Sequence, residues 1–514
     1  MATQSSSTTS GITRITGTYS GLDVDALVTA GVASDQSKLD KAKQAEQTME
    51  WQQDQYRKIM TDVTSFYNKY LTSTGDNSLV LSSDWNAMKA TSSNETAVTA
   101  TASTGANAKN YTANVSQLAT AASCQIGSSN LVSATQIYIN GTPYTLNGTT
   151  AQARATDLNS QLLNAGVKVN AQYSDFANNG AGGLILESQT LGKSSSTLTQ
   201  ASLVSATGTD QSITAGTNLN ATINDGTNLY TIDDNSTNNT SNSVTLDNVT
   251  FKFNALTTTT NPDLTTTKNP VTIGVTKDTS TIAGKLTSFV DDYNTLLKEI
   301  NGKIYETYDK NYPPLTDAQK SAMSETQITK WETKAQTGLL RQDEYLTSLS
   351  SDMKDAMTTM MSGSGFDLEK LGITPVDDYG SLNGTYKVTD KSKLTSALED
   401  NFDKVYDLFN KASSNDTWTK ADSSDGILSK LKVGLYNNVT ASDSKMAKKA
   451  GVDGYSTSIN NDLTKAITDQ QTLIDTLESN VSDKETALYN KYSILETKLS
   501  SLDSQTSALS SLSN

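Results

Sequence analysis

The chain has 514 residues and a formal net charge of −15, from 40 basic and 55 acidic residues, with a pI near 4.6. A chain this acidic lacks the basic surface that nucleic-acid binding requires, and anionic membrane surfaces would repel it. The sequence has no histidine and one cysteine, Cys124, which excludes an internal disulfide, a Ser-His-Asp triad and a cysteine-based zinc site. Hydrophobic residues make up only 35% of the chain, which favours several thin domains over one large core.

The N-terminal region carries no recognisable targeting signal. Residues 1–10 are polar, without the charged segment and apolar core of a signal peptide, and no stretch of the chain has the ~18 apolar residues of a membrane span. These features fit either a cytosolic protein or one exported uncleaved through a type III route. We expect residues 1–38 to comprise a disordered export region and an N-terminal helix, which a capping box at residues 20–23 opens.

A long helical pattern begins at Leu39. Mostly apolar side chains recur at alternating spacings of three and four residues over more than four heptads. This predicts either a coiled-coil seam or an amphipathic helix packed on its own domain. The seam is poor in Leu and Ile and includes the polar residues Glu46 and Gln53. The residues that we expect to form it are Leu39, Met49, Tyr56, Met60 and Val63.

Strand patterns predict a β-rich head domain formed by residues 91–134 together with residues 243–280. Apolar and polar side chains alternate along its strands, and an Asp247-Asn248 pair predicts a hairpin turn. We expect the strand at residues 111–115 to pair with segments far along the chain. The predicted partners are residues 244–246, 249–253 and 271–275.

A second β-rich head domain is expected as an insertion at residues 135–242. It opens with a hairpin around an Asn140-Gly141 turn. A helix follows, capped by Thr149 or Thr150 and ended by Gly166, and further strand patterns come after it.

Helical patterns return after residue 281. We assign residues 39–90 and 281–514 to a helical leg domain with a terminal coiled coil. The C-terminal heptad pattern contains one extra four-residue step after Leu488, a stutter that locally unwinds a coiled coil. A long helix at the end of a chain needs a partner, which is the N-terminal helix, another subunit, or both. The expected seam residues are Leu463, Ile467, Ile474, Leu477, Val481, Leu488, Leu495, Leu499, Leu502 and Leu509.

The predicted fold class is therefore α+β multidomain, with a helical leg from both termini and β-rich head domains inserted in the middle. The sequence contains no phosphate-binding loop, no dinucleotide fingerprint and no nucleophile elbow. Acidic pairs such as Asp291-Asp292 are expected by chance among 55 acidic residues, although a glycosidase pair distant in sequence stays open as an alternative. We expect no catalytic, cofactor-binding or metal-binding residues, no cofactor and no enzymatic activity.

Several motifs, taken in order, resemble the family of flagellar filament cap proteins, also called hook-associated caps. The N-terminal motif is Ser-Gly-Leu-Asp-Val-Asp-Ala-Leu-Val at residues 20–28, and Tyr-Thr-Ala-Asn-Val at residues 111–115 resembles the first head strand. A Tyr-Pro-Pro-Leu motif at residues 312–315 precedes Gly-Leu-Leu-Arg at residues 338–341. The motif Leu-Asp-Ser-Gln at residues 502–505 completes a resemblance that covers nearly the whole chain.

The resemblance implies a structural cap at the distal tip of the bacterial flagellar filament, which promotes flagellin polymerisation and prevents loss of monomers. It implies a secreted, extracellular protein at the flagellum tip. The implied partners are further copies of the chain in a pentameric ring, flagellin, the flagellar export apparatus and a cytoplasmic export chaperone. Host mucin or glycans are a further candidate partner of the head, while nucleic acid and membrane insertion are not expected. The alternatives are another axial protein, such as a flagellin or a hook–filament junction protein, and a surface or phage-type adhesin.

Overall fold

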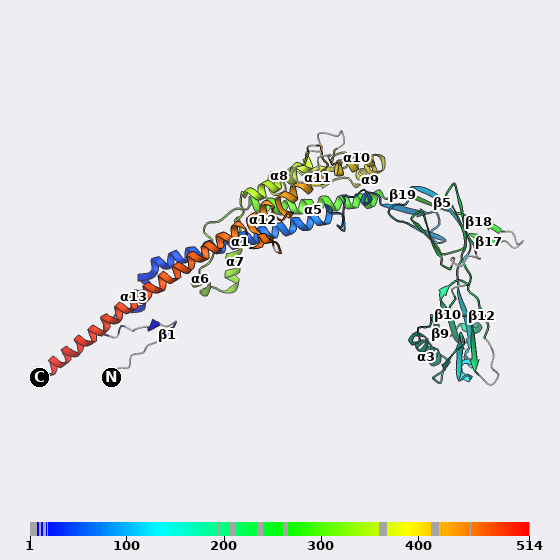
Figure 1. Cartoon of the computed structure of the whole chain (residues 1–514), viewed down its shortest axis with the longest axis horizontal. Coiled ribbons are helices and arrows are strands. Elements are labelled where there is room, and N and C mark those ends of the chain that lie inside the picture. The colour runs from blue at the N-terminus through cyan, green and yellow to red at the C-terminus, as the bar shows by residue number, and fades with distance from the viewer. Residues whose placement is uncertain are drawn as a thin grey trace. The chain divides into compact units, whose positions relative to one another are not determined.

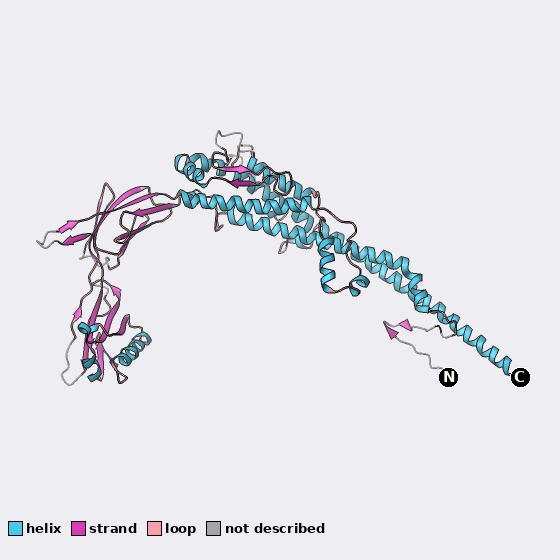
Figure 2. Ribbon diagram, turned by 180° about the vertical axis from the view of Figure 1, so that it is seen from behind, coloured by secondary structure: helices cyan, strands magenta, loops and turns pink. Residues whose placement is uncertain are grey.

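The structure is a computed structural model that describes all residues except 1–7, 10–11, 14–16, 18, 194–195, 205–210, 234–239, 261–265, 359–366, 413–420, 423, 453 and 513–514. The chain divides into two compact units, one formed by Met1–Leu81 with Ala283–Asn514 and one formed by Ser82–Ile282. The first unit is built mainly of helices and the second mainly of strands (Figures 1 and 2). The predicted α+β multidomain fold, with helices toward both ends and β-sheet domains in the middle, is confirmed.

Two long helices dominate the helical unit, α1 (Val24–Tyr70) and α13 (Asp462–Leu512). A third long helix, α5 (Thr279–Tyr305), follows the β-rich unit in the chain. A short hairpin of β20 (Ile373–Pro375) and β21 (Tyr386–Val388) packs against α5. The other elements are β1 (Thr8–Thr9), β2 (Ile12–Thr13), α6 (Asp317–Ser321), α7 (Glu325–Ala335), α8 (Glu344–Thr358), α9 (Lys391–Asp400), α10 (Phe402–Asn410), α11 (Ile427–Leu435), the π-helical turn η3 (Tyr436–Thr440), α12 (Lys445–Ala450) and the 3-10 turn η4 (Ser456–Ser458).

Helix α1 is capped by a different residue from the one that the predicted capping box implies. Asp23 caps the helix, because its carboxylate accepts a hydrogen bond from the Ala26 amide at 3.0 Å, whereas the Ser20 hydroxyl accepts one from the Leu22 amide. The helix then runs to Tyr70 without a break, so residue 38 is not a boundary in the structure. Most of the predicted disordered export region lies outside the described residues.

The core of the helical unit is built around α5. Its predicted apolar face is buried, and Phe289, Tyr293 and Ile300 are 0% exposed. The ring of Phe289 contacts Phe66 and Tyr70 from α1 and Phe409 from α10, with ring centroids 5.5–6.2 Å apart. Aromatic rings at these separations contribute packing energy beyond the area that they bury, so this cluster ties three helices together.

The β-rich unit contains two antiparallel sheets that share one apolar core. One sheet has the strand order β14-β13-β5-β19-β3 and the other the order β15-β16-β4. Tyr111 from the first and Phe251 from the second meet with ring centroids 5.2 Å apart. The strands are β3 (Met88–Ser92), β4 (Val98–Ala102), β5 (Lys109–Gln117), β13 (Asn220–Asn224), β14 (Leu229–Ile232), β15 (Ser243–Leu246), β16 (Val249–Phe253) and β19 (Val271–Lys277), with η1 (Ser82–Trp85), β17 (Thr258–Thr260) and β18 (Thr266–Lys268) outside these sheets.

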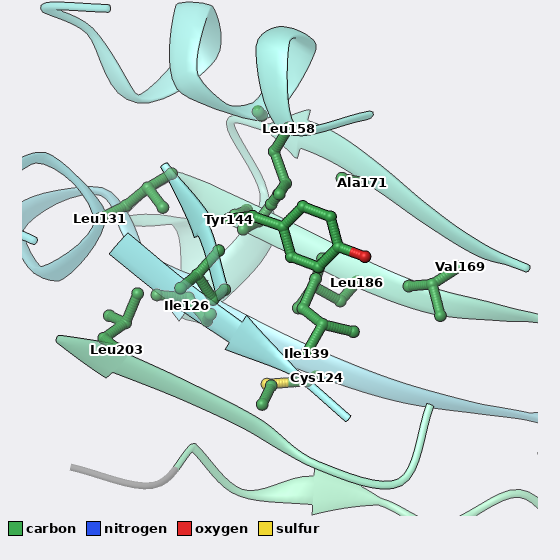
Figure 3. Close-up of a cluster of buried hydrophobic side chains, with 14 of the residues drawn as sticks. Cys124, Ile126, Leu131, Ile139, Tyr144, Leu158, Val169, Ala171, Leu186 and Leu203 are labelled. Atoms are coloured by element: carbon green, nitrogen blue, oxygen red, sulfur yellow. The ribbon is translucent and has the colours of Figure 1, made fainter. Parts of the chain in front are cut away.

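A second apolar core lies within the same unit. Its sheets have the orders β12-β6-β10-β9 and β11-β7-β8, and helix α3 (Ala151–Asn164) packs on it. Figure 3 shows Leu158 of α3 above Ile126, Tyr144 and Leu186, with Cys124 among the buried side chains. The predicted Asn-Gly hairpin joins β7 and β8. The elements are β6 (Ala121–Gly127), α2 (Ser128–Ser133), β7 (Gln136–Ile139), β8 (Thr142–Thr145), β9 (Val169–Ser174), α4 (Ala177–Gly180), β10 (Gly183–Leu191), β11 (Ala201–Val204) and β12 (Ile213–Thr214).

The limits of this inserted domain differ from the predicted residues 135–242. Strand β6 precedes that range and lies in the inserted sheet, where Cys124 pairs with Leu186. Strands β13 and β14 fall inside the range, yet β13 pairs with β5 in the outer sheet, with Ala221 opposite Val115. An alternating pattern predicts that a segment is a strand but does not identify its partner, which explains both errors.

The strand partners also differ in the outer domain. The predicted partner at 271–275 is correct, because β19 pairs with β5. Strand β16 of the β15–β16 hairpin instead pairs with β4, and its Phe251 meets Tyr111 of β5 across the core.

Candidate assembly surface

Helices α1 and α13 lie side by side and run antiparallel, as Figures 1 and 2 show for the long pair of helices. Two small apolar clusters join them. One consists of Leu39, Ala42, Ile474 and Val481, with Leu477 against it, and the other of Val24, Val28 and Tyr489, with Leu488 and Tyr492 against it.

Gly31 of α1 lies opposite the side chain of Leu488 of α13. A Cβ atom at this position would lie 2.6 Å from Cδ1 of Leu488, closer than real Cβ contacts allow. The absence of a side chain therefore lets Leu488 pack directly on the backbone of α1.

Polar contacts join the rest of the helix pair. Lys484 forms an ion pair of 2.7 Å with Asp35, and Lys43 forms one of 2.7 Å with Glu478. Hydrogen bonds from Lys484 and Lys38 lower the pKa of Asp35 to about 2. The Tyr489 hydroxyl donates to Asp25 at 2.7 Å. Exposed ion pairs of this kind contribute roughly 0–1 kcal/mol each, so the pair is held by many weak contacts.

Glu496 holds the chain segment that leads into α1. Its carboxylate accepts hydrogen bonds from the backbone amides of Tyr19 at 2.9 Å and Ser20 at 3.1 Å, and only 5% of the residue is exposed. Hydrogen bonds from Ser20 and from the two backbone amides lower the pKa of Glu496. This contact ties residues 19–20 to α13 over a sequence separation of more than 470 residues.

We expect Glu496→Gln to speed hydrogen exchange of the residue 19 and 20 amides about tenfold at pH 7, because hydrogen bonds to charged groups contribute about 1.5–3 kcal/mol. The lowered pKa means that the folded state favours the carboxylate. The attachment is therefore fully present above the ordinary glutamate pKa of about 4.3 and is lost as pH falls through the lowered value. Exchange rates corrected for intrinsic chemistry check this, with Asp503→Asn on the exposed part of α13 as control. Unchanged exchange in Glu496→Gln would contradict the role of the carboxylate.

The structure separates the predicted seam residues into three groups. Leu39, Ile474, Leu477, Val481 and Leu488 lie between α1 and α13. Tyr56, Met60 and Val63 are buried at the inner part of α1, where Tyr56 donates to Asp343 and meets the ring of Tyr345. The remaining residues of the predicted seam are Leu463, which is buried, Met49, Ile467 and Leu499, which are half-buried, and Leu495, Leu502 and Leu509, which are exposed.

The C-terminal part of α13 therefore carries an unburied apolar stripe. Leu495, Leu502 and Leu509 recur every seven residues and are 39%, 57% and 68% exposed. Leu499 lies on the same face, four residues after Leu495. We call these four residues the terminal stripe. Its heptad spacing is typical of a helix face that packs against another helix.

Sequence reasoning left two interface residues out of the seam. Tyr489 is buried within it, and Glu496 is buried at its outer end. The buried positions Ile474, Val481, Tyr489 and Glu496 are seven, eight and seven residues apart. The predicted stutter after Leu488 instead continues the seam on Leu495 and Leu499. Nothing in the sequence pattern distinguished Glu496 from a solvated acid.

The described residues offer little else for chemistry. Among them, no group of three or more His, Cys, Asp or Glu side chains could hold a metal ion. No helix within the described ranges is long and apolar enough to cross a membrane. Burial of Cys124 raises the pKa of its thiol to about 11, which leaves it protonated at neutral pH.

The comparisons with known proteins agree with the motif pattern. A family model described as the N-terminus of flagellar hook-associated protein 2 matches residues 20–122, and one described as its C-terminus matches residues 227–504.

Two curated relatives are described as flagellar hook-associated protein 2. The protein of Halalkalibacterium halodurans is 34% identical over 172 residues, which cover 33% of this chain and 30% of the relative. The protein of Thermotoga maritima is 26% identical over 172 residues, which cover 33% of this chain and 24% of the relative. The aligned stretch thus spans less than a third of the length of these relatives.

Similar solved structures include the D1-D2-D3 domains of the flagellar cap protein FliD from Escherichia coli. The identity is 20%, with 77% of this chain and 98% of that chain covered and a TM-score of 0.42. FliD from Pseudomonas aeruginosa is 18% identical, with 40% of this chain and 95% of that chain covered and a TM-score of 0.27. The C-terminal family match alone, residues 227–504, covers more than half of the 514 residues, and the chain therefore belongs to the flagellar hook-associated protein 2 family, the family of flagellar caps that its motifs resemble.

Proposed function

We propose that this protein forms the cap at the distal tip of a bacterial flagellar filament, where it promotes flagellin polymerisation and prevents loss of monomers. The observation that carries the proposal is family membership, which rests on matches at residues 20–122 and 227–504. The first range contains α1 and the second contains most of α13, the two helices that pair. In this role the protein acts by binding and assembly and has no enzymatic activity.

The exposure of the terminal stripe is consistent with a helical leg that binds other helices. Leu502 and Leu509 are more than half exposed on a helix end where residues 501–511 are all exposed. An apolar helical face in water is stabilised by packing on another helix, and the helices of the last flagellins in the filament are the proposed partner.

The weak contacts between α1 and α13 suit a leg that must release and bind again as subunits are added. A cap that moves with the growing tip needs contacts that break on the timescale of subunit addition. Small apolar clusters and solvent-screened ion pairs provide such contacts more readily than a large dry interface.

The remaining parts of the proposal concern partners and location. The protein is exported unfolded by the flagellar export apparatus, with a cytoplasmic chaperone, and acts outside the cell at the flagellum tip. It assembles with copies of itself into a ring, for which we propose five subunits. The seam residues form the leg, and the head is a candidate for contact with host mucin or glycans.

Deletion of the gene in its native bacterium tests the function. We expect hooks without filaments and abundant flagellin monomer in the medium, because arriving flagellin has no cap to fold beneath. Electron microscopy and immunoblotting of the medium measure both, and expression of the wild-type gene in trans is the control.

Filaments of normal length in the deletion strain would overturn the cap function. An adhesin would then be the better explanation, because that class of protein acts without flagellin. Loss of adhesion to mucin in the same strain would support it.

A further inference from the structure

Asparagine is followed by glycine at five places in the chain. The pairs are residues 140–141, 147–148, 179–180, 301–302 and 383–384. In such a pair the backbone nitrogen of glycine can attack the side-chain amide carbon of asparagine, because glycine has no side chain to hinder the approach. The attack requires a side-chain amide that is free to turn and a backbone that is free to bend. The surroundings of each pair therefore determine which of the five reacts in the folded protein.

Two of the five asparagines are held by several hydrogen bonds. The Oδ1 of Asn140 accepts from the backbone amides of Thr199 at 2.8 Å and Gln200 at 3.2 Å. Asn301 of α5 is 0% exposed, and its Nδ2 donates to two backbone carbonyls at 2.9 Å and 3.1 Å. Its Oδ1 accepts from the Ser350 hydroxyl at 2.8 Å. Neither amide can turn without losing these bonds, so both are protected.

Two further asparagines each donate one side-chain hydrogen bond. The Nδ2 of Asn147 donates to the Asp157 carboxylate at 3.0 Å, and the Nδ2 of Asn383 donates to the Asp378 carbonyl at 2.9 Å. The side chain must give up this bond before it reacts. A hydrogen bond to a charged group is strong enough to lower the population of the free Asn147 amide by about tenfold or more.

Asn179 has none of these restraints. It is exposed, and in the part of the chain that the structure describes its side chain makes no hydrogen bond. A Cβ atom built on Gly180 would meet no atom beyond its chain neighbours within 4 Å, so packing does not block the glycine nitrogen. The Gly180 amide donates to the Phe176 carbonyl at 3.3 Å, which is longer than the usual distance of about 2.9–3.0 Å and protects it little.

The loop around Asn179 is anchored on both sides and free between the anchors. The Asn178 amide donates to the Gln125 side chain at 2.9 Å, and the Gly182 carbonyl accepts from the Ser128 amide at 3.1 Å. Residues 178–180 have φ values of 55°, 57° and 86°, in the left-handed region that other residues than glycine rarely adopt. The three residues between the anchors are all exposed, so they can rearrange without uncovering buried side chains.

We propose that Asn179 is a site of spontaneous deamidation, where the folded protein converts asparagine to aspartate and isoaspartate. The Gly180 nitrogen loses its proton and bonds to Cγ of Asn179, the bond between Cγ and Nδ2 breaks, and ammonia leaves. Water then opens the five-membered imide at one of its two carbonyl carbons. The reaction consumes one water molecule, releases one ammonia molecule and needs no other reactant.

This modification changes the surface of the inserted domain beside Phe176, which is 89% exposed. Both products add a negative charge at residue 179, and isoaspartate also lengthens the backbone by one carbon atom. Asp175 is exposed on the same loop, so the new charge adds to one that is already there. The extent of conversion grows with time, and the loop of an old molecule therefore differs in charge and backbone from that of a new one.

Peptide mapping by mass spectrometry, during incubation of the full chain at neutral pH, tests the proposal. Conversion adds about 1 Da to the peptide, and chromatography separates its aspartate and isoaspartate forms. We expect the Asn179 peptide to convert about tenfold faster, or more, than the peptides of the other four pairs. In concentrated urea, where the folded-state hydrogen bonds are absent, we expect all five pairs to convert at similar rates.

Asn147 provides the matched comparison, because it is also exposed and differs in its bond to Asp157. Asp157→Ala removes the acceptor, and we expect Asn147 to convert about tenfold faster than in the wild type, with the rate at Asn179 unchanged. Asn179→Gln should abolish the fast reaction, since glutamine would have to close a six-membered imide. Circular dichroism checks that both variants keep the wild-type fold.

Three results would overturn the proposal. The first is an Asn179 that stays unreacted in the folded chain while the chain in urea converts. The second is any other Asn-Gly pair that converts as fast as Asn179 in the folded chain. The third is a folded Asp157→Ala variant in which Asn147 reacts no faster, because hydrogen bonding would then not be what selects the site.

Discussion

Replacement of Leu502 and Leu509 by serine is expected to abolish filament growth while leaving the fold intact. Both leucines are more than half exposed, so their removal takes little apolar area out of the folded chain, and we expect stability to change by no more than about 0.5 kcal/mol. Their proposed role is to pack against helices at the filament tip. A deletion strain that expresses the double variant should release as much flagellin into the medium as the deletion strain itself.

The control for this double variant is Leu473→Ser on the same helix. Leu473 is 46% exposed, but it lies next to Ile474 and outside the seam, on the part of α13 that pairs with α1. We expect normal filaments from the control. Thermal unfolding by circular dichroism must be the same for all three proteins. Normal filaments from the double variant would contradict a role for the terminal stripe in assembly.

Phe289→Ala is expected to destabilise the helical unit by about 3–5 kcal/mol, the usual cost of truncating a buried aromatic residue in a core. Phe289 is 0% exposed and meets Phe66, Tyr70 and Phe409, so its loss leaves a cavity where three helices join. Urea unfolding followed by far-ultraviolet circular dichroism, which reports mainly the helices, measures the change. The residues of the β-rich unit should keep their hydrogen-exchange protection.

Phe176→Ala is the matched control for the core substitution, because Phe176 is 89% exposed in the β-rich unit. We expect its effect to stay within about 0.5 kcal/mol. A cost below about 1 kcal/mol for Phe289→Ala would contradict a core centred on the four rings, since truncation of a well-packed phenylalanine costs more.

The helices could be predicted because their signals are local. The spacing of Leu286, Phe289 and Tyr293 defines one face of α5, and all three are 0% exposed. The Asn140-Gly141 turn was equally clear, because both residues adopt the positive φ values, 52° and 83°, that a tight hairpin turn requires. In both cases a few neighbouring residues determine the conformation.

Strand partners could not be predicted, because pairing depends on residues far apart in sequence. The alternation in Ala221 and Ile223 fits either β-domain equally well. Their place opposite Val115 and Ala113 follows from which core the apolar face completes. A pattern of period two identifies the buried face of a strand and leaves the neighbouring strand open.

The predicted seam residues lie on two helices, and the structure gives them three different surroundings. Periodicity shows that Tyr56, Ile474 and Leu509 each lie on an apolar face. It does not show that Tyr56 packs within the inner part of the helical unit, that Ile474 packs on α1, or that Leu509 is 68% exposed. Glu496 escaped prediction for a related reason, since a carboxylate is counted as polar unless the backbone amides that it accepts from are known.

The way in which one β-domain is inserted into the other affects the order of folding. The Thr120 amide donates to the Thr217 carbonyl at 3.0 Å, so the two ends of the insertion lie a hydrogen bond apart. Strands β5 and β13 must pair across the intervening segment of about 100 residues, and closing a loop of that length costs roughly 2–3 kcal/mol more in chain entropy than closing one of about five residues. When the inserted domain folds first, its adjacent ends reduce the closure to that of a short loop. Early folding of the insertion therefore speeds formation of the outer sheet in a chain that starts unfolded.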